Sequence, residues 1–452
     1  MEISAVSHDR PHARGPADDP RPRVVVTGLG VISSIGIGRA DFLTALRAGA
    51  CGASPISGFD TTGFRYARAY EVPGFDPETR LRRIEPGRFG KVGAQAAAAA
   101  RMAMRDAGLD PAAVRDEPGV IAVGTTCGES LDVDALAAAE VAGGLGRLPA
   151  PRARRVHPGR LPVAVAVELG LTDVEAVTIP TVCAAGNYAV GHALDALRGG
   201  EAEFAICGGA DSVSRMAFAG FYRLRAWASE RCSPFDLDRD GFMFGEGAGM
   251  LVLETLDHAR RRGATVLAEV AGFGLNCDAE HPTRPLRERV AECLSSALRD
   301  AGAAPREVDV VFAHGTGTKI NDAMESAVFA DVFGDAPPPV TALKSMIGHT
   351  QGAAGAHACI AAVLGMEHGF IPPTVNFSTP DPECPVDCVT GASRPARVRT
   401  AVVNSLGVGG NNAAVVLRHP GALAGGPPTG HGTSVENEPS TGRGTATKEG
   451  AA

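Results

Sequence analysis

One cysteine and two later histidines each lie in a glycine-rich segment whose residue types can do chemistry. Cys183 stands in TVCAAG, His314 in AHGTGT and His349 in KSMIGH. A thiol can carry an acyl group as a covalent thioester, and imidazoles can donate or accept protons near neutral pH. A lone cysteine or histidine is usually structural, but three of them in small-residue loops indicate a catalytic set. The pattern predicts an acyl-transferring enzyme rather than a binding module.

Short strand patterns and longer helix patterns follow one another in alternation along the chain, and these elements would position the three residues. The alternation predicts an α/β fold with largely parallel sheets covered by helices. Because the scheme repeats, we expect two similar halves, residues 22–260 and 261–419, with the site at their junction. Residues 1–21 are rich in Pro, Arg and Asp, and residues 420–452 contain almost no large apolar residues, so we expect both segments to be disordered tails.

Each of the three residues is expected at the end of such an element. Cys183 follows a strand predicted over residues 175–179 and opens the helix 184–198. The N–H groups and the dipole of a first helical turn favour a thiolate, so we expect a lowered pKa for this thiol. His314 follows a predicted strand, and His349 precedes the helix 353–364. Loops at such positions can present side chains to one shared opening.

Composition limits the classes of protein to consider. The 452 residues carry a net charge of −8, which argues against nucleic acid as a main partner. No apolar run approaches the roughly 18 residues needed to cross a membrane, and the N-terminus has no apolar signal region. We therefore expect a cytoplasmic protein with reduced thiols. Cys384 and Cys388 lack a second pair at metal-site spacing, so no metal site is predicted.

One motif imitates a cofactor site. Gly28-Leu-Gly30 follows a predicted strand, as in the fingerprint of dinucleotide-binding proteins. That fingerprint needs a third glycine where Ser33 stands, and an acidic residue about 20 positions on, where only small residues occur. We predict that this glycine pair forms a structural turn.

Six segments, taken in order and spacing, identify a family resemblance that covers about residues 23–418. They are VVVTGLGVIS, TVCAAG, CSPFDLDRDGFMFGEGAGMLVLE, AHGTGTKINDAMES, ALKSMIGHTQGAAG and NSLGVGGNNA. Together they resemble the β-ketoacyl-[acyl carrier protein] synthases of the thiolase superfamily, in particular elongating synthases of fatty-acid and type II polyketide pathways. The resemblance implies a thiolase-like layered αβαβα fold of two pseudo-symmetric halves.

The resemblance also implies roles for the catalytic residues. Cys183 is similar to the nucleophile that accepts an acyl chain from a carrier thioester. His314 and His349 resemble the pair that promotes decarboxylation of a malonyl extender and stabilises its enolate. Lys344 corresponds to the charged group that holds this network, with Glu325 opposite it. Substrates would be carried on the phosphopantetheine arm of an acyl carrier protein, and no other cofactor is expected.

Binding residues follow from the same resemblance. The hydroxyls of Thr316 and Thr318 would hold the phosphopantetheine arm, with Asp322 near the catalytic network. The backbone N–H groups of Cys183 and Val408 would form an oxyanion hole. These synthases build their site beside a subunit interface, so a homodimer or a heterodimer with a chain-length-factor-like homologue is expected. The residues placed for docking of the acidic carrier protein are Arg82, Arg83 and Arg88.

The chain departs from the family pattern at three places. Leu406 and Val408 stand where two phenylalanines usually gate the acyl pocket, and Cys127 stands where some relatives carry a bulky aliphatic residue. The segment after Asp278 is also shorter than in housekeeping relatives. A smaller residue 127 would admit a longer or stiffer acyl group. These departures favour a specialised polyketide or polyene synthase over generic fatty-acid elongation.

Several related classes are possible on this fold. A thiolase would need a second cysteine near the C-terminus, and residues 404–412 contain none. A starter-type synthase would pair cysteine and histidine with asparagine, whereas His349 fills that position. A loading decarboxylase would carry glutamine in place of Cys183. A non-catalytic chain-length factor typically lacks the nucleophile. It is kept as an alternative, together with a housekeeping fatty-acid elongation synthase.

Overall fold

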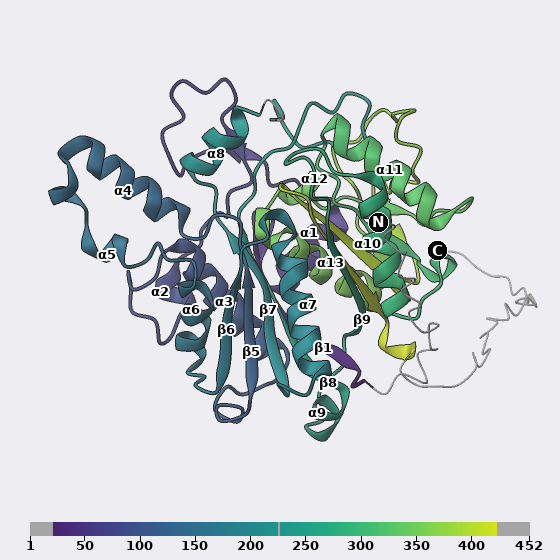
Figure 1. Ribbon diagram of the computed structural model, residues 1–452, viewed down its shortest axis with the longest axis horizontal. Helices are drawn as coiled ribbons and strands as arrows, with labels where there is room; N and C mark the ends of the chain where they lie inside the picture. The colour runs from purple at the N-terminus through teal and green to yellow at the C-terminus, as the bar shows by residue number, and fades with distance from the viewer. Residues whose placement is uncertain (1–20, 225–226, 423–452) are drawn as a thin grey trace, which may run out of the picture.

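An unbroken run of ten buried residues forms β1 (Val24–Ser33), the strand at the middle of the fold. The structure is a computed structural model that describes residues 21–224 and 227–422 (Figure 1). The predicted disordered tails, 1–21 and 420–452, lie almost entirely outside the described residues. In the described part, no helix is long and apolar enough to span a lipid bilayer.

The strands form one eleven-stranded sheet whose two halves have the same order. From the centre outward, the first half runs β1-β8-β7-β5-β6 and the second runs β9-β15-β14-β10-β11. In each half the successive pairs are antiparallel, antiparallel, parallel and parallel. The predicted pseudo-symmetric halves are therefore confirmed. The bounds are β5 (Gly119–Gly124), β6 (Val174–Ile179), β7 (Phe204–Asp211), β8 (Gly247–Thr255), β9 (Ala268–Cys277), β10 (Val310–Phe312), β11 (Val340–Thr341), β14 (Thr400–Gly407) and β15 (Asn411–Arg418).

The prediction of largely parallel sheets is wrong. Within the described part of the large sheet, parallel pairing is confined to β5–β6, β5–β7, β10–β11 and β10–β14. The central strands pair antiparallel, and β14 returns directly into β15 through a tight turn that contains Gly409 and Gly410 at φ 90° and 86°. Strand–helix alternation along the chain predicts a parallel pair only where a helical crossover joins two neighbouring strands. The central neighbours β1–β8, β8–β7, β9–β15 and β15–β14 are antiparallel pairs instead.

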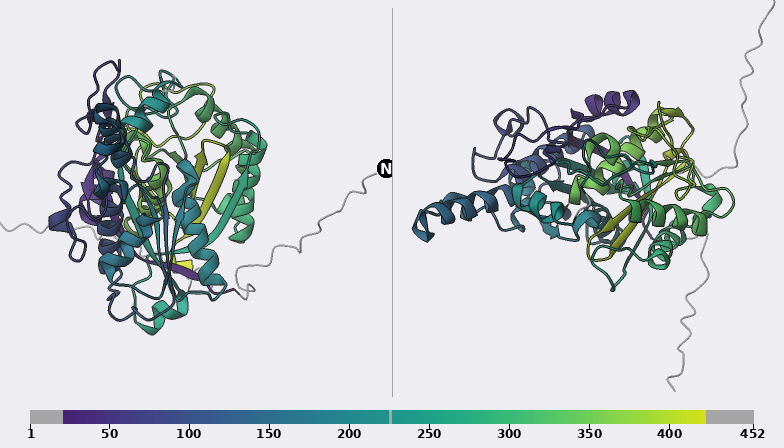
Figure 2. Two further views of the ribbon diagram at one scale, coloured as in Figure 1. Left: turned by 60° about the vertical axis from the view of Figure 1, so that its left-hand side comes forward. Right: turned by 90° about the horizontal axis from the view of Figure 1, so that it is seen from above.

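Helices form three layers around the two half-sheets (Figures 1 and 2). The middle layer consists of α7 (Ala185–Arg198) and α13 (Ala354–His368), which contact strands of both halves. Every residue of α13 from Ala354 to Met366 is buried, as expected for a helix that is apolar on all sides. The outer layers are α3 (Lys91–Asp106) with α6 (Arg160–Leu169), and α10 (Arg287–Asp300) with α11 (Lys319–Phe333). This arrangement is the predicted αβαβα layering.

The glycine pair near the N-terminus lies inside β1, so the predicted turn is wrong. A Cβ atom on Gly30 would lie 1.9 Å from the carbonyl oxygen of Ala99, and one on Gly28 would lie 2.1 Å from that of Ala103. These glycines let the alanine-rich face of α3 approach the strand backbone. The local sequence could not reveal this, because the helix that needs the space lies some 70 residues further on.

Two helices extend away from this layered body. They are α4 (Ser130–Gly143) and α5 (Ala150–Ala153), at the left of Figure 1. Val141 near the end of α4 is 90% exposed, and Leu145 just beyond it is 72% exposed.

Candidate active site

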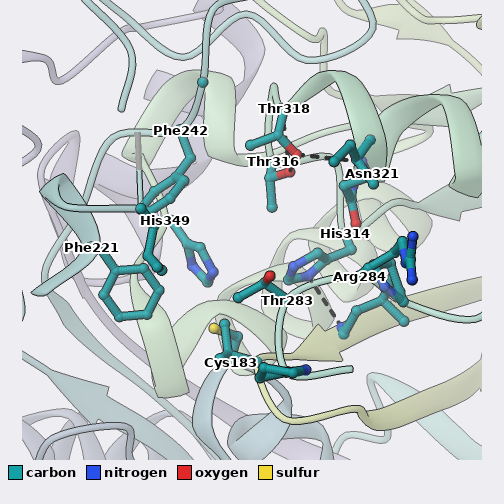
Figure 3. A pocket seen from close by; sticks show the side chains of 18 of the residues that line it. Cys183, Phe221, Phe242, Thr283, Arg284, His314, Thr316, Thr318, Asn321 and His349 are labelled. Atoms are coloured by element: carbon teal, nitrogen blue, oxygen red, sulfur yellow. Dashed lines mark hydrogen bonds between the residues drawn. The ribbon is translucent and has the colours of Figure 1, made fainter. Parts of the chain in front are cut away.

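The site lies where loops from both halves of the sheet meet. Cys183 is in the turn between β6 and α7. His349 is in the equivalent turn of the other half, between β11 and α13. His314 follows β10, the neighbour of β11. Figure 3 shows the thiol and both imidazoles turned toward one cavity, so the three residues singled out in the sequence are brought together.

A strained turn presents the Cys183 thiol. A single 3-10 turn, Val182–Ala184, separates β6 from α7, and Val182 has φ 56°. Positive φ is a genuine outlier for a β-branched residue and is typical of functional turns. Cys183 is 4% exposed. The small residues after it allow close packing, since a Cβ atom on Gly186 would lie 2.8 Å from the carbonyl oxygen of Gly352.

The expectation of a lowered thiol pKa is wrong for the free protein. Burial raises the pKa of Cys183 to about 11, because the thiolate loses its hydration. The backbone N–H groups of Val408 and Cys183 and the charge of Lys344 act in the opposite direction, but they do not overcome burial. The two N–H groups predicted to form an oxyanion hole thus both favour the thiolate form.

His314 is held as a neutral imidazole with its proton on Nε2. Its Nδ1 atom accepts the backbone N–H of Leu406 at 3.3 Å and lies 3.3 Å from Nζ of Lys344. Burial, followed by the charge of Lys344, holds its pKa well below the usual range. Because Nδ1 is an acceptor, the single proton of the neutral ring is on Nε2.

His349 has the same protonation state through a different contact. Its Nδ1 atom accepts the backbone N–H of Gln351 at 3.1 Å, and burial again holds its pKa well below the usual range. The rings of His314 and His349 are perpendicular, with centroids 5.4 Å apart. Two neutral imidazoles with Nε2–H groups can donate hydrogen bonds to one oxygen atom as negative charge develops on it.

Buried charges hold the backbone around His314. Glu325 accepts the N–H groups of His314 and Gly315 at 2.6 and 2.8 Å and the side-chain amide of Asn404 at 2.8 Å. Lys344 donates to the carbonyl oxygen of His314. Burial lowers the pKa of Lys344, and the negative charge of Glu325 partly restores it. Burial likewise raises the pKa of Glu325, and its hydrogen bonds from Gly315, Asn404 and His314 act in the opposite direction. The two side chains therefore act together on His314.

The cavity of about 410 Å³ contains only part of the predicted set in its wall. Cys183, both histidines, Thr316, Thr318, Leu406 and Val408 line it. The hydroxyls of Thr316 and Thr318 are 3.0 Å apart. Glu325, Lys344, Asp322 and Cys127 are not in that wall. Asp322 accepts the N–H of Phe235 at 2.9 Å and that of Gly317 at 3.2 Å, so it supports the loop that carries Thr316 and Thr318.

The three arginines predicted for docking lie elsewhere on the molecule. Arg82 and Arg83 line a second hollow of about 680 Å³, together with Arg152 of α5 and Arg155 just after that helix. Arg88 is exposed next to them, over the ring of Phe89. None of the three lines the cavity that contains Cys183.

Sequence reasoning missed several wall residues. Phe221 and Phe242 face Cys183 across the cavity, and the loop 281–285 forms part of its rim (Figure 3). The loop was noted only for its length, although His281, Thr283 and Arg284 in it are polar. No group of three or more His, Cys, Asp or Glu side chains suited to a metal ion occurs among the described residues.

Comparison with known proteins shows the family whose resemblance the sequence motifs carry. Residues 21–259 match the family described as "Beta-ketoacyl synthase, N-terminal domain", and residues 267–378 match "Beta-ketoacyl synthase, C-terminal domain". The chain is 36% identical to "3-oxoacyl-[acyl-carrier-protein] synthase 2" of Coxiella burnetii, over 87% of this chain and 98% of that protein.

Two solved structures extend the comparison. "The ishigamide ketosynthase/chain length factor" is 50% identical with a TM-score of 0.87, covering 88% of this chain and 99% of that one. A type II polyketide synthase acyl-carrier protein in complex with its ketosynthase provides a match at 31% identity and TM-score 0.82, covering 88% and 100%.

The fold and the site thus define a condensing enzyme of the thiolase fold. The chain belongs to the β-ketoacyl synthase family. It is a ketosynthase, an acyltransferase of fatty-acid or type II polyketide synthesis.

The raised thiol pKa predicts how Cys183 reacts with iodoacetamide. Only the thiolate is alkylated, and at a pH below the pKa its fraction rises about tenfold per pH unit. With a pKa of about 11, the alkylation rate of Cys183 should keep rising between about pH 7 and 9. Peptide mass spectrometry after timed alkylation measures the rate, with exposed Cys51 as the internal reference. A plateau below about pH 8 would contradict burial as the dominant influence.

Proposed function

We propose that this chain is the catalytic ketosynthase subunit of a type II polyketide system that makes polyene-like chains by decarboxylative Claisen condensation. The observation that carries the proposal is the convergence of Cys183, His314 and His349 on one cavity. The 50% identity to a ketosynthase/chain length factor, against 36% to a 3-oxoacyl-[acyl-carrier-protein] synthase, favours the polyketide assignment. Housekeeping fatty-acid elongation is the alternative.

In the first step, the sulfur of Cys183 attacks the carbonyl carbon of an acyl thioester brought by a carrier. The carrier's phosphopantetheine thiol leaves with the proton that Cys183 loses, so the thioester is exchanged without net charge. The N–H groups of Cys183 and Val408, both of which lower the pKa of the thiol, would stabilise the oxyanion of the tetrahedral intermediate. Thr316 and Thr318 in the cavity wall would hold the arm.

In the second step, a malonyl thioester loses carbon dioxide, and the electron pair of the broken bond passes to the α-carbon. The Nε2–H groups of His314 and His349 donate to the thioester oxygen, on which the enolate charge develops. The α-carbon then attacks the acyl-Cys183 thioester, which forms the new carbon–carbon bond and expels the Cys183 thiolate. The thiolate takes up one proton from water, which restores the Cys183 thiol for the next cycle. Lys344 and Glu325 keep the His314 imidazole in place during both events.

The proposed partners are an acyl carrier protein and a second ketosynthase-like chain. Arg82, Arg83 and Arg88 would contact the acidic carrier. Because they lie away from the catalytic cavity, they would supplement contacts at its mouth. The exposed apolar residues Val141 and Leu145 suit a subunit contact. The second chain is proposed to be a chain-length-factor-like homologue, with a homodimer as the alternative.

No resident cofactor is proposed, because the chemistry needs only substrates carried on phosphopantetheine. We also propose a cytoplasmic location, where the ten cysteines would remain reduced.

Acyl transfer to Cys183 can be tested by mass. Incubation with an acyl-carrier thioester should add one acyl group to the Cys183 peptide. Cys183→Ala should abolish this transfer and lower condensation by a factor of about 1,000 or more. Cys51→Ser, at an exposed thiol outside the cavity, is the matched control and should keep full activity. Condensation that persists in Cys183→Ala would exclude the mechanism.

The polyketide assignment can be tested through assembly. Co-expression with a homologue that lacks the nucleophile and is encoded beside this chain should yield a heterodimer by native mass spectrometry. Only that pair should elongate a carrier-bound chain repeatedly. A stable homodimer that elongates ordinary fatty-acyl primers at full rate would instead establish the housekeeping alternative.

The hypothesis that Cys127 enlarges the acyl pocket can be tested through product length. Cys127 is not in the cavity wall, but it packs in the same apolar cluster as the wall residues Phe221 and Phe242. Cys127→Phe should therefore shorten the longest product, as measured by liquid chromatography and mass spectrometry. Cys51→Phe, at an exposed position, should leave product length unchanged. An unaltered product from Cys127→Phe would show that residue 127 does not limit the chain.

A further inference from the structure

A buried carboxylate that the proposed mechanism does not use lies behind the catalytic cavity. Asp211 is the last residue of β7 and is fully buried. Its Oδ1 atom accepts the hydroxyl of Thr125 at 2.8 Å and the N–H of Cys127 at 3.1 Å. Its Oδ2 atom accepts the N–H groups of Thr126 and Gly352, each at 2.7 Å. One side chain thus joins three segments that are distant in sequence.

The first segment is the loop after β5, which carries Cys127. Both backbone N–H groups at 126 and 127 point to the carboxylate, and Thr125 adds its hydroxyl. The Oγ1 atom of Thr125 also accepts the N–H of Gly128 at 3.0 Å, which closes the loop on itself. Asp211 is therefore the common acceptor for the loop beside the Cys183 thiol.

The second segment is the turn that follows His349. Gln351 has φ 54°, a strained value for a residue other than glycine. Its side chain donates to the carbonyl oxygen of Ser212 at 3.2 Å, and the next N–H, that of Gly352, donates to Asp211. The end of β7 therefore holds this turn at two points. Held in this way, the backbone N–H of Gln351 reaches Nδ1 of His349 at 3.1 Å.

Tight packing prevents these segments from adjusting independently. A Cβ atom on Gly352 would lie 2.5 Å from Cα of Thr125, and one on Gly209 would lie 2.2 Å from the carbonyl oxygen of Gly352. A Cβ atom on Gly186, in the helix that follows Cys183, would also clash with that oxygen, at 2.8 Å. A shift in the 351–352 turn is thus transmitted to the loop at 125–127 and to the start of α7.

The charge of Asp211 also acts on the nucleophile. It raises the pKa of Cys183, whereas Lys344 and the N–H groups of Val408 and Cys183 lower it. Loss of the negative charge should therefore move the titration of the thiol to lower pH. A residue that merely filled space would have no such effect.

We propose that Asp211 is a positioning residue of the condensing site: it holds the Cys127 loop and the His349 turn in register, and so orients the His349 imidazole for the enolate step. The inference rests on the proposed ketosynthase mechanism. It assigns to Asp211 a larger effect on decarboxylative condensation than on acylation of Cys183, because His349 is needed for the former.

Asp211→Asn is the direct test. An amide has one acceptor oxygen, so its NH2 group must face N–H donors that the carboxylate accepted, and one of the two connections breaks. Condensation per acylated enzyme should fall by about 10- to 100-fold, the loss expected from a displacement on the order of 1 Å. Acylation of Cys183 should stay within about threefold of wild type. The alkylation profile of Cys183 should move to lower pH.

Asp195→Asn on α7 is the matched control, since it removes an exposed carboxylate from the far part of that helix. It should leave condensation, acylation and the alkylation profile unchanged. If Asp211→Asn does not fold, Thr125→Val decides. That variant removes one of the four hydrogen bonds to Asp211, together with the bond from the N–H of Gly128, and keeps the charge, so condensation should fall several-fold with an unchanged alkylation profile.

Two results would overturn the proposal. One is condensation by the deciding variant within twofold of wild type. The other is an equal loss of acylation and condensation with an unchanged thiol profile, which would indicate a structural role alone. Both results are measured relative to the turnover of the wild-type enzyme. Failure of the proposed function would appear in a different variant, as condensation by Cys183→Ala, so the two kinds of failure can be distinguished.

Discussion

Burial of the reactive groups is the constraint on which the rest of the structure depends. Cys183, His314 and His349 are each 4% exposed, and Lys344 is 6% exposed. Burial alone disfavours every charged form: it keeps the thiol protonated and the imidazoles neutral. Backbone N–H groups then satisfy both Nδ1 atoms, so the remaining protons point into the cavity. The donors are arranged before any substrate arrives, which lowers the reorganisation cost of catalysis.

The pseudo-symmetry of the sheet explains how such a site can be assembled. In each half, the outermost parallel strand precedes a central helix: β6 precedes α7, and β11 precedes α13. Between strand and helix, the first half supplies the Cys183 thiol and the second supplies the His349 imidazole. Neither half contains a complete site, so the contact between α7 and α13 is as important to the chemistry as the side chains themselves.

The elements around the site could be predicted well from sequence. The strand expected at 175–179 is β6 (Val174–Ile179), and the helix expected at 184–198 is α7 (Ala185–Arg198). Strand direction and the burial of Cys183 could not be predicted, because periodicity reports only local conformation. Asp211 was also missed, since its partners lie at 125–127 and 352 and share no sequence pattern with it.

The sequence by itself determined which residues carry the chemistry and in which order their loops occur, because residue type and glycine spacing are local properties. Only the tertiary structure decided the protonation of the thiol and both imidazoles, the antiparallel centre of the sheet and the wall formed by Phe221, Phe242 and the loop 281–285. Desolvation and hydrogen bonding between distant segments control all of these, and neither exists before the chain has folded.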